Sequence, residues 1–156
     1  MSDSHDNRDA VRDAVRLFND AECRMVLHAG DFVAPFAAGE LAALRCPVTA
    51  VFGNCDGEKA GLERTIADFG KILAPPHDFL YEDRRFLLTH TPFSNRFHVA
   101  SGRYDVLIYG HTHRSEVRRE GGTLIINPGE TGGWVNGRST VALLDVRRLR
   151  VDILSL

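Results

Sequence analysis

Four apolar stretches of this 156-residue chain each end in polar side chains that can bind a metal ion. The stretches read MVLHAGD, VTAVFGN, RFLLTH and DVLIYGHTH, and they end at Asp31, Asn54, His90 and the pair His111 and His113. Short apolar runs of this kind are typical of buried strands. Because sites in open α/β sheets form at the carboxyl ends of strands, we expect these side chains to meet at one rim.

Helical and strand patterns alternate through the first two thirds of the chain, and the last third contains strand patterns alone. Helices are predicted at residues 8–19, 36–44, 62–69 and 97–101. Strands are predicted at residues 25–29, 48–52, 85–88, 106–109, 116–119, 123–126, 140–146 and 150–154. This order favours an α/β layered domain, with either one mixed sheet or two stacked sheets flanked by helices.

Composition predicts one ordinary globular domain covering residues 1–156, since hydrophobic residues make up 44% and charged residues 26%. The net charge of -2 gives no basic field for a nucleic-acid backbone, so a nucleic-acid partner is not expected. No apolar run approaches the roughly 20 residues of a membrane helix, and no signal peptide is visible. Three cysteines without a CxxC pair indicate reduced thiols, so we expect a cytoplasmic protein. The number of subunits stays open, with a homo-oligomer as one option.

The N-terminal sequence SDSH adds a further pair of candidate ligands, Asp3 and His5. Residues two apart in an extended chain project to the same side, so this pair could hold one ion. His111 and His113 share the spacing, but a turn after the preceding glycine could direct them to two neighbouring ions. Seven ligands are too many for one cation and fit two, with Asp31 as the natural bridge. Such a pair of metals can clamp a phosphoryl group and generate hydroxide at neutral pH.

The motifs SDSHDN, HAGD, GNCD, THT and GHTH, in this order, resemble those of the calcineurin-like metallophosphoesterases. The sequence is most similar to the small archaeal and bacterial phosphodiesterases related to the retromer subunit, which INPGETGGWVNGRSTVALLD also resembles. The similarity runs from Asp3 to about Asp145. It implies a four-layer αββα sandwich with two mixed β-sheets. It also implies that a metal-bridging hydroxide attacks the phosphorus of a small phosphodiester substrate.

The resemblance further implies how the ligands divide between two divalent cations. The first would be held by Asp3, His5, Asp31 and His113. The second would be held by Asp31, Asn54, His90 and His111. Oxygen and nitrogen ligands without thiolate suit manganese, which we favour, and also nickel, iron or zinc. Asn54, His90 and Cys55 are the side chains expected at the reacting centre.

The first departure from the family lies at the N-terminus, where the family places an apolar central strand directly before the Asp-x-His pair. Here only Met1 and Ser2 precede Asp3. We expect the translated sequence immediately upstream to contain four to seven apolar residues. Without that strand, Asp3 and His5 would lie on a frayed end.

The second departure is GNCD, where many members carry GNH[DE] with a histidine that can protonate the leaving group. GNCD is common among the small phosphodiesterases. A thiol such as that of Cys55, with an ordinary pKa near 8.5, is a poor general acid. The sequence therefore predicts modest activity and a preference for substrates with good leaving groups.

Two other functions are weighed against the phosphodiesterase. A non-enzymatic, retromer-like interaction scaffold is disfavoured because all seven ligand types are present. A metal-dependent nuclease is disfavoured because the chain has no basic stripe.

Several other residues receive plainer predictions. His28 is expected to be a hydrogen-bonded core histidine and His77 a solvent-facing loop residue. Asp56 is either a turn residue or a partner of the ligands, and Glu130 is expected to be structural. Core packing is the safer prediction for the aromatic residues Phe93, Phe97 and Trp134, which could otherwise cover a cleft or a subunit contact.

Overall fold

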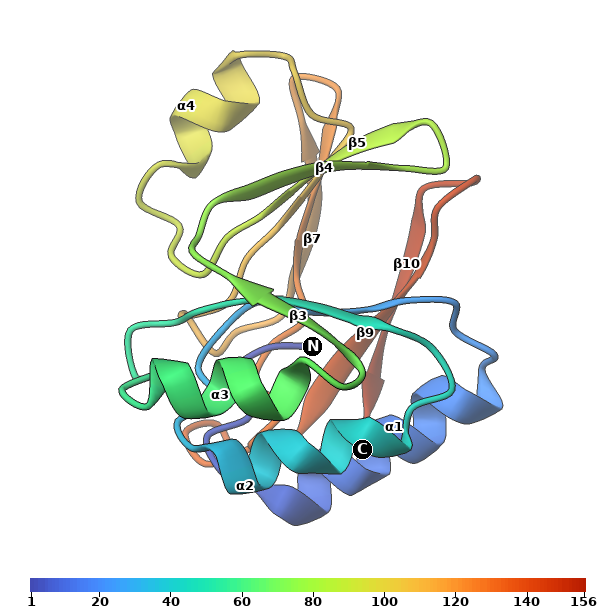
Figure 1. Cartoon of the computed structure of the whole chain (residues 1–156). Coiled ribbons are helices and arrows are strands. Elements are labelled where there is room, and N and C mark those ends of the chain that lie inside the picture. Colours follow the sequence, from blue (N-terminus) through green and yellow to red (C-terminus); the bar gives the residue numbers. More distant parts are fainter.

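The computed structural model describes all residues 1–156 and shows a mixed α/β domain with three hydrogen-bonded sheets (Figure 1). Parallel strands β1 (Val26–His28), β2 (Val48–Val51) and β3 (Gly70–Leu73) form the first sheet. The second has the order β4-β5-β6-β8-β7, with strands His77–Tyr81, Arg84–Leu88, Val106–Ile108, Thr123–Asn127 and Glu116–Glu120. The third is a hairpin of β9 (Thr140–Asp145) and β10 (Arg150–Ser155).

The helices lie on opposite sides of the molecule (Figure 1). On one side are α1 (Arg8–Asp20), α2 (Pro35–Ala38) with the 3-10 turn Gly39–Ala43, and α3 (Lys59–Ile66). On the other side α4 (Asn95–Ala100) packs against the five-stranded sheet. None of these helices combines the length and the apolar composition that crossing a bilayer requires.

Three apolar clusters hold these elements together and place the sheets between the helices. The largest packs α1 and α3 against the first sheet. A second lies between the first sheet and the five-stranded sheet and includes Ala29, Val51 and Phe86. The third lies under α4 and includes Val99. This arrangement agrees with the expected αββα class, although the β-structure is divided into three sheets instead of two.

Helix α1 forms where the sequence predicts it. The side chain of Asn7 caps the helix by accepting the Ala10 N–H at 3.2 Å, which satisfies one of the free N–H groups of the first turn. The apolar stripe at helical spacing is buried: Val11, Ala14, Val15 and Phe18. The helix is thereby fixed over the first sheet.

The residues before α1 are not frayed, which corrects the expectation for a chain that lacks the upstream strand. Met1, Ser2 and Asp3 are buried. The Ala29 N–H donates to the Met1 carbonyl at 3.0 Å, and the Asp3 N–H donates to the Gly30 carbonyl at 2.9 Å. Strand β1 and the loop that follows it therefore hold Asp3 in place.

The structure also corrects three predictions of local structure. The helix predicted at residues 62–69 occurs at Lys59–Ile66. It ends early because the chain then enters strand β3, which the sequence pattern does not predict. The 36–44 helix is a short α-helix followed by a 3-10 turn. His77 lies half-buried on the unpredicted strand β4, which pairs with β5 and stacks Phe79 on Phe86. In contrast, His28 is a core histidine as expected: it is buried, and its Nε2 lies 3.1 Å from the hydroxyl of Ser4.

Candidate metal centre

The loops after β1, β2, β5 and β6 bring the predicted ligands to one rim of the structure. Asp31 follows β1, Asn54 follows β2, and His90 follows β5. His111 and His113 follow β6. The Gly30 turn after β1 has a φ of 93°, a conformation that glycine adopts without strain. The strand-end pattern in the sequence therefore indicates correctly where these side chains gather.

The first group of side chains combines the N-terminal pair with the second histidine of GHTH. The Nε2 atoms of His5 and His113 lie 3.3 Å apart. The Asp3 Oδ1 atom is 3.6 Å from His113 Nε2 and 3.9 Å from His5 Nε2. Three potential metal-ligating atoms thus face a common point.

The second group converges on the amide oxygen of Asn54. The Oδ1 atom of Asn54 lies 2.8 Å from His90 Nε2 and 2.8 Å from His111 Nδ1. His90 is buried, and its other ring nitrogen lies 2.8 Å from the Ala29 carbonyl. That contact fixes the ring so that Nε2 faces the site, as outer partners of metal-binding histidines commonly do.

Asp31 lies between the two groups. Its Oδ2 atom is 3.7 Å from His5 Nε2 and 3.4 Å from His90 Nε2. Its Oδ1 atom accepts the Cys55 N–H at 2.8 Å. The donor set of carboxylate oxygen, amide oxygen and imidazole nitrogen suits divalent cations, and Asp31 is the residue placed between the two groups.

The electrostatics of the centre favour an ionised Asp31. Burial opposes ionisation, but hydrogen bonding to His90 and the Cys55 N–H outweighs it and holds the pKa of Asp31 well below its usual range. Burial raises the pKa of Asp3 above its usual value, with only partial compensation from Ser2 and the nearby histidines. Burial lowers the pKa of His90, but hydrogen bonding to Asp31 and the Ala29 carbonyl raises it above its usual value.

Asp56 ties together the two loops that carry Asp31 and Asn54, which decides between its two predicted roles. Its buried carboxylate accepts four backbone N–H groups: Asp31 at 3.1 Å, Phe32 at 2.7 Å, Val33 at 2.8 Å and Gly53 at 2.7 Å. Asp56 is therefore a partner of the ligand loops and more than a local turn residue.

Gly53 is required by the close approach of these two loops. A Cβ atom added at this position would lie 2.0 Å from the Asp31 Oδ1 atom and 2.3 Å from its backbone nitrogen. Such contacts are far shorter than any side chain tolerates. The glycine of GNCD thus allows Asp31 to lie directly against the loop that follows β2.

Glu130 contacts the centre, although the sequence indicated only a structural role. It is 1% exposed and accepts the backbone N–H groups of Trp134, Val135 and Asn136. Its Oε1 atom also lies 3.2 Å from His113 Nδ1, an ion-pair distance without hydrogen-bond alignment. A buried carboxylate beside a candidate ligand fits the outer partner of a metal-binding histidine. The only signal for this in the sequence is a charged residue in the NPGE turn, whose other residues are uncharged.

The aromatic residues expected in the core lie instead at the surface. Phe93 is 77% exposed, and its ring centroid is 5.9 Å from that of His111. Trp134 is 65% exposed and donates its indole N–H to the His5 carbonyl at 2.9 Å. Phe97 on α4 is also exposed. Phe93 and Trp134 therefore border the metal-ligand cluster from different loops.

Cys55 lies at the surface beside Asn54, whose amide N–H donates to its sulfur at 3.3 Å. Partial burial, together with hydrogen bonding to Asp31 and the charges of Asp31 and Asp56, raises the pKa of the thiol to about 11. The thiol is therefore protonated and neutral at pH 7 and releases its proton poorly.

The α/β fold and the carboxylate, amide and imidazole groups gathered at its strand ends match the class of calcineurin-like phosphoesterases. The chain belongs to this superfamily, whose sequence model, the calcineurin-like phosphoesterase superfamily domain, matches residues 1–149. It is a hydrolase of the branch that contains small archaeal and bacterial phosphodiesterases.

Two curated relatives support this placement. Phosphodiesterase MJ0936 from Methanocaldococcus jannaschii is 36% identical over 152 residues, covering 95% of this chain and 92% of the relative. Phosphodiesterase YfcE from Escherichia coli is 31% identical over 142 residues, covering 82% of this chain and 75% of the relative.

Solved structures agree with the sequence relatives. The structure of a novel archaeal phosphodiesterase has a TM-score of 0.95 and 34% identity, covering 100% of this chain and 97% of that one. Vps29 from Entamoeba histolytica shares the fold with a TM-score of 0.66 at 18% identity, covering 93% of this chain and 88% of that one. The expected resemblance to phosphodiesterases and to the retromer subunit is confirmed.

Proposed function

We propose that this protein hydrolyses small phosphodiesters with two divalent cations that share Asp31. The observation that supports it best is the position of the Asp31 Oδ2 atom, 3.7 Å from His5 Nε2 and 3.4 Å from His90 Nε2. Asp3, His5 and His113 would complete the ligands of one cation. Asn54, His90 and His111 would complete those of the other.

Two cations held in this way would lower the pKa of a bound water and clamp the phosphoryl group, which is the chemistry of two-metal hydrolases. The residues of the chain hold and orient the ligands: Asp56 fixes the loops, and Ala29 and Glu130 contact the outer nitrogens of His90 and His113. We favour manganese, with nickel, iron and zinc as alternatives, because the ligands are oxygen and nitrogen atoms. We also propose a cytoplasmic location, in keeping with three free cysteines.

The proposed activity is tested with a chromogenic bis-aryl phosphate. We expect manganese-dependent hydrolysis that falls to the uncatalysed rate when a chelator removes the metal and returns when manganese is restored. Hydrolysis that persists after complete metal removal would contradict the proposal. Cleavage of DNA in preference to the small diester would indicate the nuclease instead, and partner binding without turnover would indicate the scaffold.

Replacement of Cys55 by histidine should improve turnover of diesters with poorer leaving groups. Imidazole has a pKa closer to neutrality than this thiol, so it donates a proton to the leaving oxygen more readily. We expect kcat on a dialkyl phosphodiester, whose leaving group is an alkoxide, to rise about tenfold or more, with a smaller change for a diester with a nitrophenyl leaving group. Steady-state kinetics on both substrates check this. C55S is the matched control, since it removes the thiol without adding an acid; equal rates for the histidine and serine variants would contradict the prediction.

A further inference from the structure

Two exposed aromatic side chains lie beside different groups of the candidate metal ligands. The Phe93 ring centroid is 5.9 Å from that of His111, which belongs to the second group of ligands. The Trp134 indole donates to the carbonyl of His5, which belongs to the first group. Small-molecule sites combine a few polar groups with aromatic walls. The centre and the two rings beside it have this composition.

The indole of Trp134 is fixed by contacts of both its side chain and its backbone. Its ring N–H donates to the His5 carbonyl at 2.9 Å, and its backbone N–H donates to the buried Glu130 carboxylate at 2.8 Å. Gly132 leaves room for the ring, since a Cβ atom there would lie 3.1 Å from the indole Cδ1 atom. Because the single donor of the ring is already used, a ligand can meet this side chain only through its apolar surface.

Phe93 lies in a tight turn shortly after the ligand His90. The Asn95 N–H donates to the Pro92 carbonyl at 3.0 Å, which places Phe93 at a central position of the turn. Its ring is exposed and inclined at 60° to the ring of His111. A phenyl ring has no hydrogen-bonding group, so it recognises a flat apolar partner by stacking or edge contact. Phe93 and the indole surface therefore select for the same kind of group.

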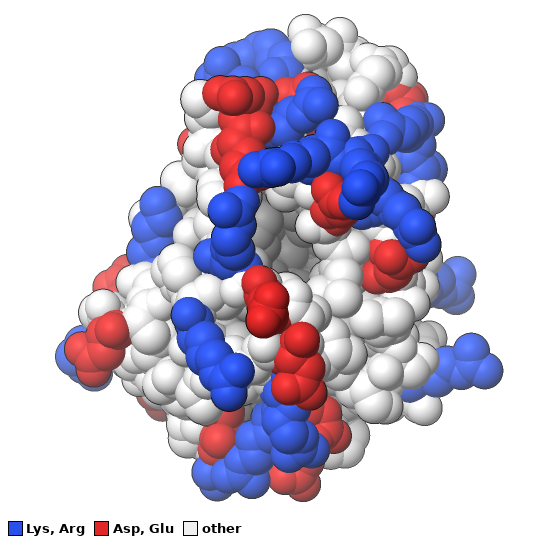
Figure 2. Space-filling model, turned by 90° about the vertical axis from the view of Figure 1, so that its right-hand side faces the viewer, with Lys and Arg blue, Asp and Glu red and all other residues white.

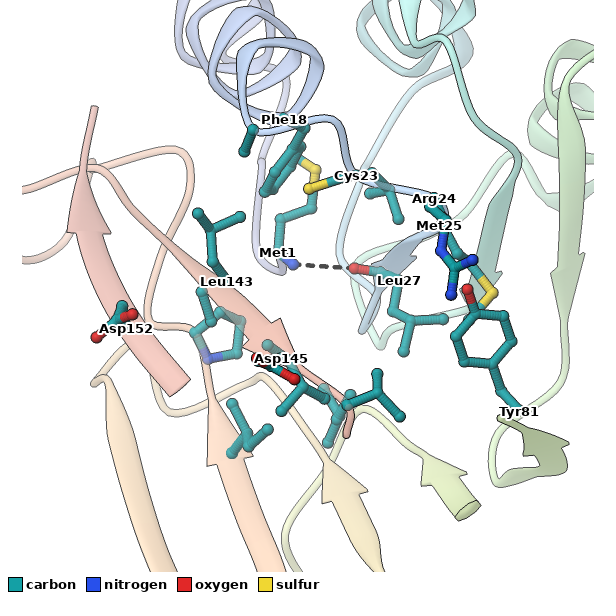
Figure 3. Close-up of a pocket in the computed structure, with 18 of the residues that line it drawn as sticks. Met1, Phe18, Cys23, Arg24, Met25, Leu27, Tyr81, Leu143, Asp145 and Asp152 are labelled. Atoms are coloured by element: carbon teal, nitrogen blue, oxygen red, sulfur yellow. Dashed lines mark hydrogen bonds between the residues drawn. The ribbon is translucent and has the colours of Figure 1, made fainter. Parts of the chain in front are cut away.

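The apolar groove that Figure 2 shows as a hollow among charged side chains is a separate feature of the molecule. Its volume is about 460 Å³, and its lining includes Phe18, Tyr81 and Leu143 (Figure 3). None of the seven candidate ligands lines this groove, and neither does Phe93 or Trp134. Of these aromatic residues, Phe93 and Trp134 are therefore the ones that a substrate bound at the ligands would meet.

A phosphodiester presents a charged centre and two uncharged ester groups to such a site. The negative charge is carried by the phosphoryl oxygens, which a pair of cations would clamp. The two ester groups project from phosphorus in different directions, and the protein places one ring next to each group of ligands. Stacking of a flat ring on an aromatic side chain strengthens binding by about fivefold or more.

We propose, on the basis of the phosphodiesterase function proposed above, that Phe93 and Trp134 determine specificity by each contacting one ester group of the substrate. The substrate class is a small phosphodiester in which both ester groups carry a flat aromatic ring. Aryl groups and nucleobases share this chemistry, and neither side chain has a free hydrogen-bonding group that would distinguish them. The two residues bind the substrate and take no part in the chemical step.

Calorimetric titration of the manganese-loaded protein with diphenyl phosphate tests the proposal, because phenolate is a poor leaving group and binding is measured before turnover. F93A and W134A should each raise the dissociation constant about fivefold or more. W134F should stay within about twofold of the wild type, since it keeps a ring but loses the indole N–H. F97A is the matched control, because Phe97 is an exposed ring whose centroid lies 4.6 Å from the Arg96 guanidinium. Circular dichroism verifies that each variant is folded.

Three further probes sharpen the test. Methyl phenyl phosphate carries one ring that can occupy either position, so each alanine variant should weaken its binding less than that of diphenyl phosphate. With bis-p-nitrophenyl phosphate, both variants should raise KM and leave kcat within about twofold, as expected for a contact that is equally strong in the ground state and the transition state. A dinucleoside monophosphate separates the two sources of rings: tighter binding than diphenyl phosphate, lost in the same variants, indicates nucleobases, and weaker binding indicates simple aryl groups.

Equal dissociation constants of diphenyl phosphate for the wild type, F93A and W134A would overturn the proposal. So would a W134F protein that binds as weakly as W134A, since the indole bond to His5 would then be the cause of the effect. A wild-type protein that does not bind diphenyl phosphate would overturn it as well, whether or not other diesters are hydrolysed. The proposed function fails by a different result, the absence of manganese-dependent hydrolysis in the wild type.

Discussion

Replacement of Asp31 by alanine should remove phosphodiesterase activity and lower the metal content from two ions per chain to at most one. Asp31 Oδ2 lies 3.7 Å from His5 and 3.4 Å from His90, so this one carboxylate would serve both cations. The hydrogen bonds that keep its pKa well below the usual range also keep it charged at neutral pH. We expect the rate to fall by more than the roughly 10–100-fold loss that follows removal of an outer partner of a ligand.

The measurements are metal analysis of the purified protein and the initial rate on a bis-aryl phosphate. Circular dichroism shows whether the variant is folded, so that loss of metal is not confused with unfolding. D13A is the control, because Asp13 is a carboxylate on α1 that pairs with Arg16 and is not one of the candidate metal ligands. A folded D31A protein that retains two ions and normal turnover would refute the shared role of Asp31.

Replacement of Asp56 by alanine should destabilise the protein as well as weaken metal binding. Four backbone N–H groups from two loops would lose a charged acceptor, and buried donors without partners cost about 1–3 kcal/mol each. Because the losses are not additive and water would reach some donors, we expect the free energy of unfolding to fall by about 3–5 kcal/mol. Tm should fall by roughly 10 °C.

Urea denaturation of the metal-free protein measures the stability, and manganese titration measures the binding. D56N is the informative companion, because its amide keeps the shape and one acceptor oxygen but loses the charge. It should fall between the wild type and D56A in both measurements. If the free energy of unfolding of D56A lies within about 0.5 kcal/mol of the wild-type value, the carboxylate does not hold the loops together.

The sequence indicates the site better than it indicates the sheets. Asp31, Asn54 and His90 could be located because each follows an apolar run, and strand ends meet at a rim whatever the exact strand order. The prediction that the aromatic residues pack in the core is wrong, because hydrophobicity predicts burial only on average. The loops that carry Phe93 and Trp134 decide the exposure of these two side chains.

Strands β3 and β4 were missed because their stability comes from distant partners. Strand β3 is a four-residue segment, GKIL, that pairs with β2 some twenty residues earlier. Strand β4 follows two prolines and alternates half-buried with exposed residues, so its local pattern is weak. Pairing across such separations depends on packing that no local window contains. The β9–β10 hairpin forms a sheet separate from the first one, and this division also depends on long-range packing that the local sequence does not contain.

The bond between the Trp134 indole N–H and the His5 carbonyl has a practical consequence. Trp134 is the single tryptophan of the chain, so its ultraviolet emission comes from one known place. A cation that binds the imidazole of His5 would move the backbone carbonyl of His5, which accepts the hydrogen bond from the indole. Titrations at the centre can therefore be followed by intrinsic fluorescence, without a dye, a label or a chromogenic substrate.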